Sequence, residues 1–283
     1  MKPLLQLLLC GLLVASACNK SYETTSSPPP ADQPDQEPET AAPQDALMPE
    51  SPDSSLSIRL DTTDLAPEPD TPLKILLEGS YHKNEVWSGA EKKDWLGLFH
   101  ENGAYVLRPA KLEISTVHDP VLDEEHVRSG REVKAAEPNL VFFLTGLQHV
   151  KHGAVDTAHY AKTVVAAGKD LTYTLHGKAY TIHAYGDSLE INDYGYSYKN
   201  YGWKVSGMKQ GKTVEQKLTE HERFDASVYV LLWAGDLDRD GIPDLLLDLS
   251  NHYNVSRYAL FLSSGAGRGK LYKKMAEFEV VGS

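Results

Sequence analysis

The sequence predicts a mainly β protein, built from antiparallel sheets as a sandwich or a partial, blade-like barrel and preceded by a disordered tether. Three observations lead to this fold class. Many short segments after residue 72 are rich in β-branched and aromatic residues and are bounded by Gly, Asn and Asp. Two of these segments carry hairpin turn residues, and helix-like periodicity is scarce.

The hairpins are the most specific strand signals. Residues 95–108 place Asn102-Gly103 between two apolar runs, and Asn-Gly favours the positive backbone angles of a tight hairpin turn. Residues 171–187 predict a second hairpin about His176-Gly177-Lys178. Further strands are expected at residues 111–117, 188–192, 196–205, 213–218, 227–233, 245–249, 257–263 and 271–281.

Helices are expected to be few. Residues 157–167 fit a short helix ended by Gly168, and residues 121–136 contain helix formers but also Gly130, which fits an excursion from the sheets. No repeat of fixed period is visible, so a complete propeller is not expected.

The N-terminus predicts export. Residues 1–17 combine Lys2, a short apolar run and small residues, which is the pattern of a secretory signal peptide. Residues 15–18 (Ala-Ser-Ala-Cys) resemble the lipobox of bacterial lipoproteins, which implies a diacylated Cys18, a lipid membrane as partner and a place in the cell envelope. Asn19 then favours the outer membrane. The alternative is ordinary signal peptidase cleavage after Ala17; Cys10 lies inside the signal.

Residues 18–72 predict a tether. Eleven of the sixteen prolines lie between Pro28 and Pro72, and residues 19–72 hold twelve acidic and two basic residues. Such a composition buries too little apolar surface to order itself, although residues 55–61 alternate and fit one extra strand. The net charge of −12 therefore falls mostly on the tether, which leaves a domain over residues 73–283 near −3. We expect no strong basic patch and no nucleic-acid partner.

The clearest motif is Gly235–Ser250, "GDLDRDGIPDLLLDLS". Four carboxylates at alternating or near-alternating positions can converge on a hard cation, Gly241 permits a sharp turn, and calcium prefers such oxygen ligands. The predicted Ca²⁺ ligands are the side chains of Asp236, Asp238, Asp240 and Asp244 and the carbonyl of Ile242. Position 12 of an EF-hand is Leu247 here, and the flanks are strand-like, so we expect a strand–calcium loop–strand unit with a structural, weakly bound ion.

This motif resembles one repeat of the FG-GAP or VCBS type, which forms blades of integrin-type β-propellers. The resemblance covers residues 228–264 and includes all four acids, the glycine and the leucine that follows. Arg239 replaces the usual small residue and is expected to point outward. Only one copy is present, so propeller-based ligand binding is not implied.

A row of aromatic residues is the second candidate binding feature. Tyr194, Tyr196, Tyr198, Tyr201 and Trp203 crowd into ten residues. Such a row fits either a surface that stacks on a carbohydrate or protein ligand or simple packing within a sheet.

No catalytic residue is predicted. His149, His152 and His159 lack the further ligands of a zinc site. We expect a membrane-anchored, calcium-stabilised lipoprotein with a binding or envelope-associated role. The alternative is an envelope hydrolase, glycosidase-like, with carboxylates in residues 118–125, which include His118, Asp119, Asp123, Glu124 and Glu125, or in residues 183–187.

Overall fold

The computed structural model describes residues 73–282 except 84, 148–149 and 193–194, and the side chains of residues 189–196 are outside the description. All the described residues belong to one compact unit, Leu60–Ser283. The predicted signal peptide, Cys18, the tether and the possible strand at residues 55–61 lie outside the described residues. Within the described part, no helix is long and apolar enough to cross a membrane.

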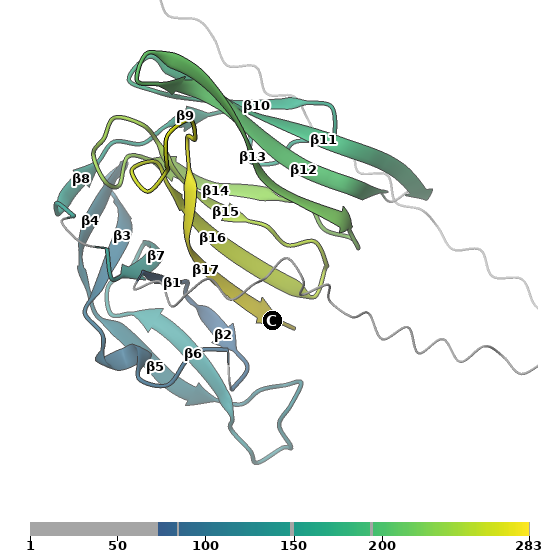
Figure 1. The fold of residues 1–283 in the computed structure, drawn as a ribbon. Helices are drawn as coiled ribbons and strands as arrows, with labels where there is room; N and C mark the ends of the chain where they lie inside the picture. The colour runs from purple at the N-terminus through teal and green to yellow at the C-terminus, as the bar shows by residue number, and fades with distance from the viewer. Residues whose placement is uncertain (1–72, 84, 148–149, 193–194, 283) are drawn as a thin grey trace, which may run out of the picture. The chain divides into compact units, whose positions relative to one another are not determined.

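The predicted fold class is confirmed, because the structure is built from antiparallel strands in four sheets (Figure 1). The N-terminal sheet has the order β1-β7-β3-β4-β8, and the small sheet has the order β2-β6-β5. Their strands are β1 (Lys74–Leu76), β2 (Gly79–Tyr81), β3 (Trp95–Glu101), β4 (Ala104–Ala110), β5 (Leu112–Val117), β6 (Gly130–Ala135), β7 (Leu140–Thr145) and β8 (Gly153–Val155), with one 3-10 turn, η2 (Ala90–Lys92).

The long-strand sheet and the C-terminal sheet form the second half of the chain, with the orders β13-β12-β11-β10-β9 and β14-β15-β16-β17. Their strands are β9 (His159–Tyr160), β10 (Asp170–Leu175), β11 (Lys178–Asn192), β12 (Gly195–Lys209), β13 (Lys212–Arg223), β14 (Val230–Gly235), β15 (Asp244–Asp248), β16 (Val255–Leu262) and β17 (Lys273–Val281). In the C-terminal sheet the spatial order equals the chain order, so it is a four-stranded meander (Figure 1).

Both predicted hairpins form. Asn102 and Gly103 have φ of 51° and 80° between β3 and β4, and His176 and Gly177 have φ of 48° and 74° between β10 and β11. Positive φ at both central residues matches the right-handed twist of the strands that the turn connects.

The C-terminal sheet is buried on both faces. Leu246 belongs to one hydrophobic core, with side chains of the N-terminal and small sheets, whereas Leu245 and Leu247 belong to a second core, with the long-strand sheet. A strand covered on both sides needs apolar residues at every position, not alternate ones. This explains why the acidic loop leads into an unbroken leucine run.

The expected helix at residues 157–167 is wrong. Residues 159–160 form β9, and tertiary hydrogen bonds use the backbone around it: the Ala158 amide donates to the Ala234 carbonyl, and the Leu231 amide donates to the Thr163 carbonyl. Pairing with β14 therefore overrides the helix propensity of the alanines. The predicted excursion at residues 121–136 ends at β6, and a loop precedes that strand.

Candidate metal centre

The acidic loop joins the first two strands of the C-terminal sheet, β14 and β15. Its start is fixed from outside, because the Asp236 amide donates to the Asp156 carbonyl at 2.8 Å. Arg239 and Gly241 take positive φ of 64° and 82°, which bends the chain back toward β15. The carboxylate of Asp236 then accepts the amides of Asp240 (3.0 Å) and Gly241 (2.9 Å).

Three of the predicted ligands converge. One carboxylate oxygen from each of Asp236, Asp238 and Asp244 lies within 4.8 Å of the others. Asp236 and Asp244 are buried, and Asp238 is half-buried. Asp244 is held rigidly, since its two oxygens accept the amides of Leu237 at 2.9 Å and Ser263 at 2.8 Å. The cluster is therefore preorganised by backbone donors.

Asp240, the fourth predicted carboxylate ligand, is hydrogen-bonded to the end of β16. Its Oδ2 accepts the Ser263 hydroxyl at 2.6 Å and its Oδ1 accepts the Ile242 amide at 2.9 Å, and it is not part of the three-carboxylate cluster. Asp240 therefore ties the loop to the end of β16. The Ile242 side chain is buried in the second core.

The electrostatics of the loop are unfavourable without a counter-charge. Burial raises the pKa of Asp244 well above its usual range, and the nearby carboxylates of Asp238 and Asp240 raise it further. The two backbone hydrogen bonds lower this pKa, but they do not offset the increase. Burial also raises the pKa of Asp238, with additional contributions from Asp240 and Asp236. A cation among these oxygens would remove the repulsion between them.

A buried tyrosine hydroxyl of the neighbouring sheet is also unsatisfied. The Tyr180 hydroxyl is fully buried and finds no hydrogen-bond partner among the described residues. Burial raises its pKa, and the carboxylates of Asp240 and Asp236 raise it further, so it feels the charge of the loop. An orphaned polar atom of this kind fits an ion or its water at the loop. The oxygen-only donor set is one that calcium prefers.

Arg239 does more than point outward. It is exposed, and its Nη2 donates to the carbonyls of Lys151, His152 and Ala154 at 3.2, 3.2 and 3.0 Å. The residue thereby fastens the loop to the segment around β8. The sequence offered no signal for this contact, because the partners are backbone atoms far away along the chain.

The aromatic row divides into two groups. Tyr201 and Trp203 are fully buried in the second core, where Trp203 Nε1 donates to the Tyr201 hydroxyl at 2.8 Å and Tyr201 donates to the Val165 carbonyl at 2.5 Å. These two side chains present no surface to a ligand, so for them the alternative of packing within a sheet applies. Tyr198 is half-buried and contacts Tyr201. Tyr194 and the side chain of Tyr196 lie outside the description.

Asp119 and Asp123, two carboxylates of the hydrolytic alternative, are held by hydrogen bonds within the loop before β6 and, for Asp119, by His82. Asp119 contacts His82 Nδ1 at 2.5 Å and accepts the amides of Val121 and Leu122, and Asp123 accepts the amide and hydroxyl of Ser129. These contacts fold the loop before β6.

The remaining carboxylates and histidines do not join Asp119 and Asp123 in a common cluster among the described residues. Glu124 and Glu125 are exposed, and His183 contacts Asp170 at 2.6 Å on the long-strand sheet. His152 and His159 are exposed, and His149 lies outside the described residues.

A basic groove is the feature that sequence reasoning missed. Two adjoining cavities are lined by fifteen residues. These residues come from the β12–β13 hairpin, from the end of β16, and from the segment that leads into β17. They are Lys209, Gln210, Lys212, Val214, Gln216, Leu218, Phe261, Ala266, Gly267, Arg268, Gly269, Lys270, Tyr272, Lys273 and Lys274. Six are cationic and none is acidic, so the expectation of no strong basic patch is wrong locally.

Comparisons with known proteins give no relative. No family model matches the chain, no curated protein matches it, and no solved structure matches it.

Proposed function

We propose that this chain is a membrane-anchored, calcium-stabilised β-rich lipoprotein with a binding role in the bacterial cell envelope. The observation that carries the calcium part is the convergence of Asp236, Asp238 and Asp244 within 4.8 Å, two of them buried. Three like charges in a partly desolvated loop are costly unless a cation compensates them. The raised pKa of Asp244 and the orphaned Tyr180 hydroxyl support the same conclusion.

The role of the ion is structural in this proposal. The loop joins β14 to β15, and Ser263 at the end of β16 donates to both Asp240 and Asp244. A bound Ca²⁺ would thus hold three strands of the C-terminal sheet in register. Extracellular calcium modules bind in the range of about 0.1–1 mM, and three carboxylates without a bidentate glutamate favour the weaker part of that range.

The FG-GAP or VCBS resemblance gives further support. The acidic loop connects the first two strands of a four-stranded antiparallel meander, and four-stranded sheets are the blades of β-propellers. We infer one blade-like unit, embedded between other sheets. The anchoring part depends on the lipobox-like sequence before Cys18.

Two experiments test the two parts separately. Isothermal titration of the chelator-treated protein with Ca²⁺ should show one site with a Kd on the order of 0.1–1 mM, and the Asp238→Asn variant should show none. Equal heats for both proteins would overturn the calcium site. Metabolic labelling with a palmitate analogue should mark the wild type and not Cys18→Ala; an unlabelled wild type would overturn the lipid anchor.

A further inference from the structure

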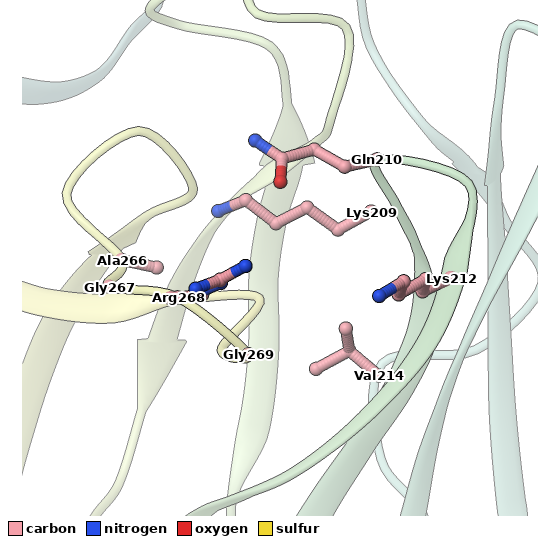
Figure 2. A pocket seen from close by; sticks show the side chains of 8 residues that line it. All are labelled: Lys209, Gln210, Lys212, Val214, Ala266, Gly267, Arg268 and Gly269. Atoms are coloured by element: carbon pink, nitrogen blue, oxygen red, sulfur yellow. The ribbon is translucent and has the colours of Figure 1, made fainter.

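The basic groove has two walls from distant parts of the chain. One wall is the β12–β13 hairpin with Lys209, Gln210 and Lys212, and the other is the connection between β16 and β17 with Arg268 and its glycine neighbours. Figure 2 shows the side chains of Lys209, Lys212 and Arg268 reaching into the space between the walls. The cavity at this end measures about 560 Å³, and an adjoining cavity of about 370 Å³ continues along β13.

The positive charge of the groove is largely uncompensated. Lys212, Arg268, Lys270 and Lys273 are exposed, and no ion pair involves any of them within the described residues. Lys209 Nζ donates to a neutral group, the Ser263 carbonyl, at 2.7 Å. Among the six cations only Lys274 has a carboxylate partner in the described part of the chain, Glu277 at 2.8 Å.

The walls are fastened together beneath this charge. Gln216 Oε1 accepts the amides of Leu271 and Tyr272 at 2.8 and 3.0 Å, and its Nε2 donates to the Tyr272 carbonyl at 2.8 Å. Three hydrogen bonds from one β13 side chain thus hold the entry to β17 against the hairpin. The relative position of the two walls is therefore fixed by hydrogen bonds to the backbone and not by the long side chains at the surface.

The alternation of β13 places Lys212 on the groove face and Glu215 on the opposite face. Lys212, Val214, Gln216 and Leu218 line the groove at every second position, whereas Glu215 lies at an intervening position and is within 4.0 Å of Lys204. The Glu215 carboxylate is therefore directed away from the groove. The chain, with a net charge of −12, presents a local face of one positive sign.

We propose that this groove binds an anionic polysaccharide. Arg and Lys side chains that converge without carboxylates recognise phosphate, sulfate or carboxylate groups. Val214 and Leu218 place apolar surface between the cations, which suits the apolar faces of sugar rings. Gly267 and Gly269 have open space where a side chain would stand, so a polymer can approach the loop backbone. The two aromatic residues of the described lining, Phe261 and Tyr272, are buried, so the groove offers no exposed ring on which a nucleic-acid base could stack.

This inference deepens the binding role proposed above and does not require calcium at the acidic loop. The test therefore uses the chelator-treated full chain, so that loss of the calcium site and loss of the groove are separate results. Fluorescent dextran sulfate is the probe, and neutral dextran of the same length is its matched control. Binding is followed by fluorescence anisotropy at ~50 mM salt, where screening is weak.

The variant Lys212→Glu/Arg268→Glu should bind dextran sulfate at least ~10-fold more weakly, because two attractive contacts become repulsive. The matched variant Lys83→Glu/Lys199→Glu changes two exposed lysines outside the groove and should bind within ~2-fold of the wild type. Lys212→Gln/Arg268→Gln, which introduces no negative charge, should show an intermediate loss. Melting curves verify that each variant is folded.

Three results would overturn the proposal. Equal losses in the groove and control variants would show that binding is not local. Equal affinity for dextran and dextran sulfate would remove the role of charge. Tighter binding of a short DNA duplex than of dextran sulfate would assign the groove to another class of polymer.

Discussion

Calcium should raise the thermal stability of the folded domain, and Asp238→Asn should abolish that effect. Asp238 is the most exposed of the three clustered carboxylates, so its amide replacement disturbs the core least. A ligand that binds only the native state stabilises it by about 2.7 kcal/mol at a concentration ~100 times its Kd. With a Kd near ~0.1 mM, ~10 mM calcium reaches this ratio.

For a folded region of about 210 residues, about 1 kcal/mol shifts Tm by roughly 2–4 °C, so the wild type should gain roughly 5–11 °C. A Kd near ~1 mM would about halve the gain. Without calcium, Asp238→Asn should melt at the wild-type temperature or slightly above it, because one of three mutually repelling carboxylates has been neutralised.

The assay is differential scanning fluorimetry with and without chelator, with magnesium as the ion control. Asp94→Asn serves as the matched variant, since Asp94 is exposed and lies outside the loop. It should keep the full calcium response. The reasoning is refuted if calcium shifts the Tm of Asp238→Asn as much as that of the wild type.

Three further outcomes test the fold. His82→Gln should cost more stability near pH 5.5 than near pH 9 in urea unfolding: its hydrogen bond to Asp119 raises the pKa of His82, so this stabilisation is present below 6.5 and is lost as pH rises through the raised pKa. At low pH the stability cost of His82→Gln should shrink as the pH falls. The pKa of Asp119 is lowered from 3.8 despite its burial, so the stabilisation by this carboxylate is lost as the pH falls through the lowered pKa. Gln216→Ala should lose about 1–3 kcal/mol by chemical denaturation, because buried groups of Tyr272 lose their partners. Trp203→Ala should lose about 3–5 kcal/mol, which a ligand-facing aromatic residue would not.

Local chemistry made much of the β framework predictable. Asn102-Gly103 and His176-Gly177 determine their own turns, because few residues take positive φ easily, and each turn defines the two strands beside it. The acidic loop was predictable for the same reason: its carboxylates, glycine and spacing all lie within nine residues. Signals of this kind need no knowledge of distant residues.

Features that depend on distant residues could not be predicted. The segment at residues 157–167 has helix-forming alanines, but its backbone groups pair with β14, some seventy residues later. The strand β7 (Leu140–Thr145) is apolar at five successive positions before Thr145, without period-2 alternation, and such a run does not identify its own secondary structure. The basic groove could not be predicted because its two walls lie more than fifty residues apart in the sequence. The net charge of the chain also sums acidic and basic residues and so conceals a local cluster of one sign.

The two candidate sites should influence each other, because Ser263 contacts both. Its amide donates to Asp244, its hydroxyl donates to Asp240, and its carbonyl accepts Lys209 of the basic groove. Calcium at the loop would replace a negative field beside the groove with a neutral or positive one, which favours an anionic ligand.

Millimolar calcium should therefore tighten dextran sulfate binding about 2- to 5-fold at ~50 mM salt. Binding linkage is reciprocal, so saturating dextran sulfate should tighten calcium binding by the same factor. Asp238→Asn should bind the polymer identically in calcium and in chelator. Unequal factors from the two titrations would show that calcium acts on the polymer itself, and equal affinities of the wild type with and without calcium would show that Ser263 transmits no charge effect between the loop and the groove.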